Sequence, residues 1–153
     1  MTELKEPQPS ETITHEVVYP FPPEKVWRAL TEKDLLAQWL MPNNFKPIVG
    51  YKFQFREVPA SGWSGVVECE ILEIDKPMRL VYSWQGGANM PRTRVTWILE
   101  RIPSGTRLRL EHTGLTGSQG KIIKDTLGPG WGSKLREKLP EALKPDTGSI
   151  REV

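Results

Sequence analysis

The sequence predicts a single α+β domain in which an antiparallel β-sheet wraps around a long C-terminal helix. Segments with alternating apolar and polar residues follow one another at hairpin spacing through the middle of the chain. After Gly114 the apolar residues recur every four positions instead, which is the period of an amphipathic helix. At 153 residues the chain has the size of one domain and can bury a core without disulfides or structural metal ions.

The first strand is expected at residues 12–19, where apolar and polar side chains alternate. Prolines end it, and Pro23 suits the first turn of a helix because its missing N–H would have no partner there. Apolar residues at helical spacing then predict two short helices, at about 23–31 and 33–40, and Pro42 stops the second.

Five further strands follow in succession, and their hairpin spacing predicts an antiparallel sheet. Turn residues rich in Gly, Pro, Ser and Asp separate them. The expected strands cover residues 51–55, 66–74, 79–84, 94–101 and 106–113. The expected connections lie at residues 61–65, 75–77 and 103–105, with a flexible loop at 86–91.

The C-terminal helix is predicted from an apolar stripe that runs from Ile123 to Leu143 at four-residue intervals. Gly128-Pro129-Gly130 lies inside this stripe, and a proline in a helix interior costs about 3 kcal/mol. We therefore expect a kink or a two-piece helix at this point. The domain is expected to span residues 12–143, with flexible tails at 1–11 and 144–153.

The overall composition narrows the class of protein. Lysine and arginine number 21 against 19 aspartates and glutamates, and the charges are scattered, which argues against a nucleic-acid-binding protein. The single cysteine, Cys69, forms no internal disulfide, and neither an export signal nor a run of eighteen apolar residues is present. A cytoplasmic protein without membrane insertion is expected.

The same segments resemble the SRPBCC, or START-like, superfamily, in the branch of homologues of the activator of the ninety-kilodalton heat-shock-protein ATPase. The resemblance extends from about residue 12 to residue 143. It is carried by Pro23-Glu24-Lys25-Val26-Trp27-Arg28-Ala29-Leu30-Thr31, Leu35-Leu36-Ala37-Gln38-Trp39, Val49-Gly50, Arg79-Leu80-Val81-Tyr82-Ser83-Trp84, Val95-Thr96-Trp97, Gly105-Thr106-Arg107-Leu108 and Gly130-Trp131. Two departures are Tyr51, where family members often have a second glycine, and the Gly128-Pro129 pair.

The resemblance implies a helix-grip fold, with a curved six-stranded antiparallel sheet around the last helix, two short helices after the first strand, and a cavity between sheet and helix. Relatives bind lipids, sterols, polyketides or plant hormones, and some cyclise polyketides. Aromatic side chains on the strands fit a ligand site with aromatic walls and a few polar tips. The predicted ligand-binding residues are Phe53, Phe55, Tyr82, Trp84, Trp97, His112 and Trp131.

Other interpretations remain open for several of these residues. The aromatic side chains also suit a solid core, and His15 and His112 suit core positions with one hydrogen bond each. Arg92 and Arg94 are placed to meet a ligand carboxylate at the entrance, although a solvated strand end explains them equally well.

Catalytic and metal sites have little support in the sequence. Cys69 lies between two glutamates, which disfavour a thiolate, and no ligand set has the spacing of a metal site. Gly128–Gly132 lacks the preceding strand and the Gly-Lys-Ser/Thr of a phosphate loop. We expect no cofactor and no metal ion.

Three functions are therefore compared. The favoured one is binding of a small hydrophobic molecule, such as a lipid, a polyketide or an aromatic metabolite. The second is an enzyme of the polyketide cyclase or hydrolase kind, in which His112 works with Glu68 or Glu70 in the same cavity. The third is a co-chaperone-type regulator of a heat-shock ATPase, a possible chaperone partnership that the resemblance allows but does not favour.

Overall fold

The computed structural model describes residues 10–59, 64–87 and 90–144. In chain order the elements are β1 (Ser10–Tyr19), α1 (Pro23–Thr31), α2 (Lys33–Trp39), β2 (Lys52–Arg56), β3 (Val66–Asp75), β4 (Arg79–Trp84), β5 (Thr93–Ile102), β6 (Gly105–Thr116), α3 (Gly117–Ser133), the π-helical segment η1 (Lys134–Lys138) and α4 (Leu139–Leu143).

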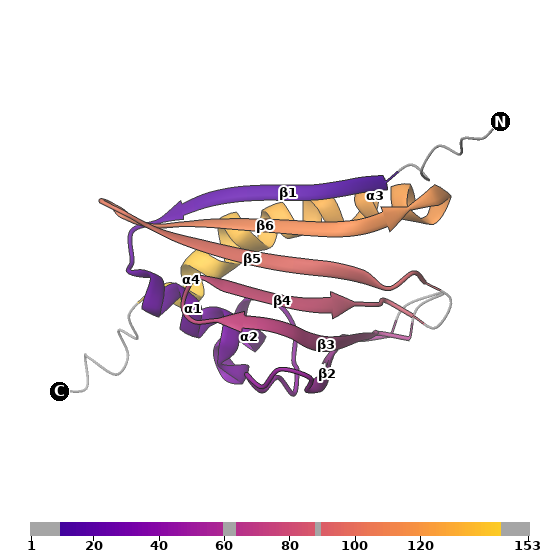
Figure 1. The fold of residues 1–153 in the computed structure, drawn as a ribbon, viewed down its shortest axis with the longest axis horizontal. Coiled ribbons are helices and arrows are strands. Elements are labelled where there is room, and N and C mark those ends of the chain that lie inside the picture. Colours follow the sequence, from indigo (N-terminus) through magenta and orange to yellow (C-terminus); the bar gives the residue numbers. More distant parts are fainter. Residues whose placement is uncertain (1–9, 60–63, 88–89, 145–153) are drawn as a thin grey trace.

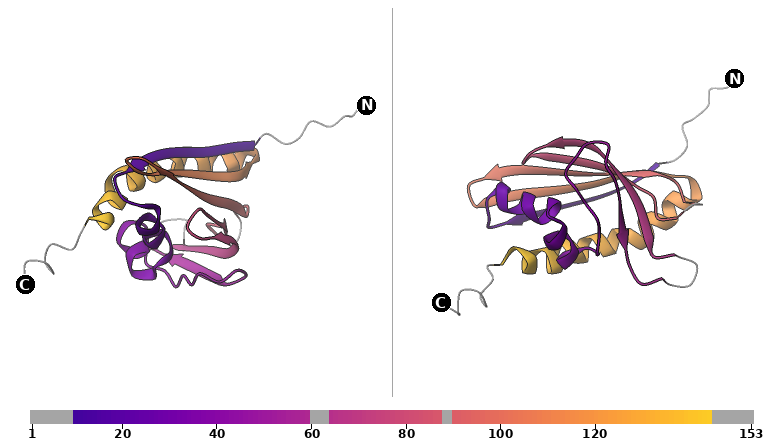
Figure 2. Two further views of the ribbon diagram at one scale, coloured as in Figure 1. Left: turned by 60° about the vertical axis from the view of Figure 1, so that its left-hand side comes forward. Right: turned by 90° about the horizontal axis from the view of Figure 1, so that it is seen from below.

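The six strands form one antiparallel sheet in the order β1-β6-β5-β4-β3-β2 (Figure 1). From β2 to β6, strands that are consecutive in sequence lie next to each other in the sheet. The last strand, β6, also pairs with the first strand, β1, and Val17 lies opposite Leu108. The sheet curves, and its concave side faces the helices (Figure 2). The predicted helix-grip architecture is therefore confirmed.

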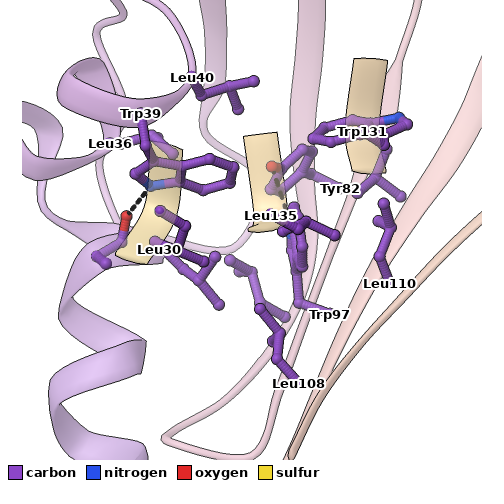
Figure 3. Packing of buried hydrophobic residues seen from close by; sticks show 14 of the residues in the cluster. Leu30, Leu36, Trp39, Leu40, Tyr82, Trp97, Leu108, Leu110, Trp131 and Leu135 are labelled. Atoms are coloured by element: carbon purple, nitrogen blue, oxygen red, sulfur yellow. Dashed lines mark hydrogen bonds between the residues drawn. The ribbon is translucent and has the colours of Figure 1, made fainter. Parts of the chain in front are cut away.

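The C-terminal helical run crosses the concave side of the sheet. Its first part, α3, packs against β1 and β6, and its last part, α4, packs against α1 and α2 (Figures 1 and 2). Trp39 from α2, Trp97 from β5 and Leu135 from η1 pack together with Tyr82 in the space between these layers (Figure 3). The core thus lies between the sheet and the helices, where an internal ligand site would have to be.

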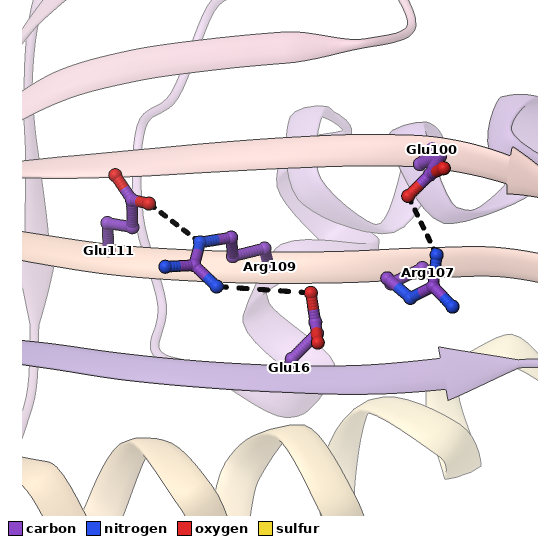
Figure 4. A network of polar contacts seen from close by, with 5 residues as sticks. All are labelled: Glu16, Glu100, Arg107, Arg109 and Glu111. Atoms are coloured by element: carbon purple, nitrogen blue, oxygen red, sulfur yellow. Dashed lines mark hydrogen bonds and ion pairs between the residues drawn. The ribbon is translucent and has the colours of Figure 1, made fainter.

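Alternation along the strands gives the sheet two different faces. Leu108 and Leu110 of β6 point inward and are fully buried, whereas Arg107 and Arg109 point outward. On the outer face Arg109 lies 2.6 Å from Glu111 and 3.9 Å from Glu16, and Arg107 lies 2.8 Å from Glu100 (Figure 4). Such exposed ion pairs add little stability, so this part of the outer face is a solvated surface.

The C-terminal helix is not divided at Gly128-Pro129-Gly130, so the two-piece form of the prediction is wrong. The helix α3 continues through Pro129 to Ser133, and the regular α-helical pattern changes only at Lys134–Lys138. A proline removes one helix hydrogen bond, and the buried residues on both sides of Pro129, Ile123 and Trp131, hold the helix against the sheet.

Two element boundaries also differ from the prediction. Ser10 and Glu11, expected in a tail, belong to β1 and pair with Thr116 and Leu115 of a longer β6. The other residues of the expected tails lie outside the described residues, except Lys144, which follows α4. Residues 61–63 of one expected turn and 88–89 of the expected flexible loop also lie outside them.

Candidate functional site

The seven residues predicted to bind a ligand come together in one cluster. Their rings form a continuous series of contacts, with centroid separations of 5.3 Å between Phe53 and Phe55, 5.5 Å between Phe55 and Trp84, 5.3 Å between Trp84 and Trp131, and 5.6 Å between Trp131 and Trp97. Tyr82 joins through Phe53 at 5.3 Å, and His112 through Trp84 at 5.7 Å. We call these seven residues and the two neighbours named next the aromatic cluster.

Two further rings belong to the aromatic cluster and were absent from the predicted set. Trp39 of α2 meets Trp97 edge-on at 5.9 Å, and Phe45, from the segment between α2 and β2, meets Phe53 at 5.0 Å. The helical spacing of Trp39 marked it as buried but did not show which strand it would meet. Phe45 lies outside any periodic segment, so no pattern in the sequence indicated its position.

The rings of the aromatic cluster fill the space that they share. Phe53, Phe55, Tyr82, Trp97 and His112 have no exposed surface. Edge-to-face contacts at these separations are those of a packed interior. In this closed arrangement side chains occupy the space beside the helix, as Figure 3 shows for Trp97 and Trp131.

Both ring nitrogens of His112 have partners inside the protein. The indole N–H of Trp131 donates to Nδ1 of His112 at 3.2 Å, and Nε2 of His112 lies 2.7 Å from Oγ1 of Thr93. The Thr93 hydroxyl donates to the carbonyl oxygen of Trp84 at 2.8 Å. Because an indole N–H only donates and a carbonyl only accepts, these bonds assign the proton of His112 to Nε2.

This network makes His112 a poor acid–base catalyst. Burial lowers its pKa to about 4, so the ring is neutral near pH 7. Both ring nitrogens already have partners within the protein. The carboxylates paired with it in the enzyme hypothesis, Glu68 and Glu70, alternate with the inward-facing Cys69 and therefore lie on the outer face of the sheet.

The other histidine, His15, has different partners. Its Nε2 lies 2.8 Å from the carbonyl oxygen of Gly128, and Nδ1 lies 3.2 Å from a guanidinium nitrogen of Arg136. His15 therefore fixes β1 to the C-terminal helix next to Pro129, the residue of α3 that has no main-chain N–H to donate. Among the described residues His15 and His112 share no hydrogen-bond partner.

A separate pocket of about 240 Å³ opens on the outer face of the sheet, near the ends of β2, β3 and β4. Arg92 lines this pocket and forms an ion pair with Glu70 at 3.1 Å. It therefore lies on the outer face and not at the entrance of the internal site, where it was predicted. Arg94 is exposed on β5 beside Ser83. The pocket is lined by Lys52, Glu68, Cys69, Glu70, Ser83, Gln85 and Arg92.

Cys69 is not an activated thiol. Burial raises its pKa above the usual range, and the charge of Glu68 raises it further. Within the described residues no group of three or more histidine, cysteine, aspartate or glutamate side chains has an arrangement that would hold a metal ion. No helix in the same part of the chain is long and apolar enough to cross a membrane.

Comparisons with known proteins identify relatives along most of the chain. The family model described as activator of Hsp90 ATPase homolog 1-like protein matches residues 20–144. No curated protein matches the chain.

Solved structures extend this comparison. Protein MLL2253 from Mesorhizobium loti is 35% identical, with 87% of this chain and 96% of that chain covered and a TM-score of 0.77. CalU16 from Micromonospora echinospora is 26% identical, with coverage of 94% and 81% and a TM-score of 0.66. The Aha1 dimer from Colwellia psychrerythraea has the same fold at 23% identity, with coverage of 87% and 96% and a TM-score of 0.70.

Proposed function

Because the chain belongs to the family of activator of Hsp90 ATPase homolog 1-like proteins, we propose that it binds a small hydrophobic molecule between its curved sheet and its C-terminal helix. The observation that carries the proposal is the aromatic cluster, which combines large ring faces with few polar atoms. Ring faces of this kind stack on lipids, polyketides and other planar or branched apolar molecules.

A guest has to displace side chains, because the rings of the cluster are in contact. The N-terminal part of α3 is the segment that moves with least loss of packing. Before Trp131 its only buried residues are Gly120 and Ile123, and Ile122 is 60% exposed. Few buried apolar contacts mean a low free energy of local opening. If the opening extends along α3 to Trp131 and breaks its hydrogen bond to His112, the indole moves away from Trp84 and Trp97 and the interior opens.

The polar atoms of the cluster define what the guest would contact. The Tyr82 hydroxyl accepts a hydrogen bond from the Trp97 indole at 3.0 Å, and its own hydrogen is available to a carbonyl or hydroxyl group of the guest. A guest with one polar group on an apolar body is therefore favoured over a pure hydrocarbon.

The test is a fluorescence titration of the full chain with a panel of flavonoids, aromatic polyketides and fatty acids. Binding in the cluster should change tryptophan emission, and Trp131→Phe should alter both the change and the affinity. The matched control is Ile122→Ala, which removes an exposed side chain from the same helix and should leave the affinity unchanged. Emission that stays constant with the whole panel, together with amide NMR signals that do not move, would contradict the proposal.

The enzyme alternative loses support because His112 has no free nitrogen and its suggested carboxylate partners face outward. Regulation of a heat-shock ATPase stays an alternative that rests on family membership. It is tested separately, by measuring whether the purified chain changes the ATP turnover of such a chaperone.

A further inference from the structure

The outer pocket lies over a gap in the pairing of β3 and β4. The regular register stops at Tyr82, and pairing resumes only at the isolated bridge between Glu68 and Gln85. Between these points the main-chain N–H of Glu70 donates to the hydroxyl of Ser83 at 2.9 Å. A side-chain oxygen thus serves as acceptor where a regular ladder would use a main-chain carbonyl.

Ser83 has a hydrogen-bond donor to spare inside this gap. Its residue is only 4% exposed, and its oxygen already accepts from Glu70. No described residue accepts the hydroxyl hydrogen. A buried donor without a partner is unfavourable, and Ser83 lines the pocket, so a guest that offers an acceptor there would recover this free energy.

The charges around Ser83 are balanced but only partly paired. Arg92 binds Glu70 at 3.1 Å, and Glu68 accepts a hydrogen bond from Gln54 at 3.1 Å. Lys52 lies opposite Glu70 on β2, and its side-chain ammonium forms no ion pair or hydrogen bond with any described residue. The pocket therefore presents a cation, a partly occupied carboxylate and a free hydroxyl donor side by side.

The solvated outer face of β1, β5 and β6 differs in this respect. There, each arginine drawn in Figure 4 already has a carboxylate partner from the same or a neighbouring strand. There β5 and β6 pair in continuous register, for example at Thr96–Glu111. In the outer pocket, by contrast, the unpaired ammonium of Lys52 lines a cavity.

We propose that the outer pocket binds a small zwitterion with one ammonium and one carboxylate group, such as a free α-amino acid. The carboxylate accepts from the Ser83 hydroxyl and from the Lys52 ammonium, and the ligand ammonium donates to Glu68. Two cations and two carboxylates line the pocket, so a guest without net charge leaves no charge unpaired. A volume of about 240 Å³ suits a molecule of this size. The site is separate from the interior proposed above.

The experiment is an NMR titration of the full ¹⁵N-labelled chain with L-alanine at millimolar concentration. Amide signals near residues 52, 68–70, 83–85 and 92 should shift, and those of the aromatic cluster on β5 should not. Two matched probes each lack one charge: N-acetyl-L-alanine lacks the ammonium group, and L-alaninamide lacks the carboxylate. Each should bind at least about tenfold more weakly, because a charge-assisted hydrogen bond contributes about 1.5–3 kcal/mol.

Variants locate the site. Lys52→Gln should weaken L-alanine binding at least about tenfold without affecting folding, because Lys52 has no partner to lose. Glu68→Gln should do the same, whereas Glu73→Gln, a carboxylate on the same strand outside the pocket, should have no effect. Ser83→Ala should abolish binding, and its NMR spectrum checks that the fold is kept. Absence of binding, equal binding of the three probes, or wild-type affinity in Lys52→Gln would each overturn the proposal.

Discussion

The hydroxyl of Tyr19, at the end of β1, donates a hydrogen bond of 2.6 Å to the main-chain carbonyl oxygen of Leu135 in the C-terminal helix. The carbonyl needs this donor because the helix is π-helical here. The N–H of Leu139 donates to the carbonyl oxygen of Lys134, five residues back, and is not available to Leu135. The residue five positions after Leu135 is Pro140, which has no N–H. Tyr19 therefore completes the helix and fixes it to the first strand. Burial raises the pKa of Tyr19 above its usual range, which keeps the hydroxyl a donor.

Replacement of Tyr19 by phenylalanine should lower the free energy of unfolding by about 1–3 kcal/mol, since it leaves the Leu135 carbonyl buried without a donor. Urea denaturation measures the change. Tyr51→Phe is the matched control, because the Tyr51 hydroxyl bonds to no described residue and its loss should be nearly neutral. Equal stabilities of the two variants would contradict the role assigned to Tyr19.

The Thr93 hydroxyl should contribute strongly to the free energy of unfolding, because it accepts a hydrogen bond from His112 and donates one to the carbonyl oxygen of Trp84. Thr93→Val leaves both groups unpaired and should destabilise the fold by about 2–4 kcal/mol. Thr96→Val, also buried but with no side-chain hydrogen bond among the described residues, should change stability little. Thermal and urea unfolding compare the two variants, and a similar loss in both would argue against the network.

Acid should destabilise the protein through His112. Its pKa is about 4 in the folded state and about 6.5 in an unfolded chain, so between these values the unfolded chain binds more protons. The stabilisation is complete above about pH 6.5 and is lost as the pH falls through about 4, a total of about 3 kcal/mol. His112→Gln should remove this part of the pH dependence, whereas His15→Gln should keep it. Unfolding free energies measured from pH 7 to pH 4 would contradict the assignment if His112→Gln followed the wild-type curve.

Two glycines of the C-terminal helix should respond oppositely to alanine. A Cβ on Gly132 would lie 3.0 Å from Cε1 of His15 and 3.1 Å from a guanidinium nitrogen of Arg136, so Gly132→Ala should destabilise the contact with β1 by about 1 kcal/mol. A Cβ on Gly130 meets nothing within 4 Å, and Gly130→Ala should stabilise the helix by up to about 1 kcal/mol. Denaturation midpoints test the pair. If the N-terminal part of α3 opens for a guest, Gly130→Ala should also slow ligand association.

Much of the site could be predicted because strand alternation determines which side chains share a face. Phe53, Phe55, Tyr82 and Trp84 do lie together on the concave side. The same alternation, applied to β3, excludes Glu68 as a partner of His112, since its neighbour Cys69 faces inward. The enzyme hypothesis overlooked this local constraint.

Periodicity by itself determined the order of elements, the antiparallel succession of β2 to β6 and the inward face of each strand, because these depend on neighbours close in sequence. The pairing of β1 with β6, which makes the sheet six-stranded, was implied only by the family resemblance. Only the tertiary structure decided that the rings touch, that both nitrogens of His112 are occupied, and that the helix changes form at Lys134 instead of Gly128. Each of these depends on residues far apart in the chain, such as Thr93 with His112 or Tyr19 with Leu135. Contact between distant residues is set by three-dimensional packing, and a local sequence pattern carries no information about that packing.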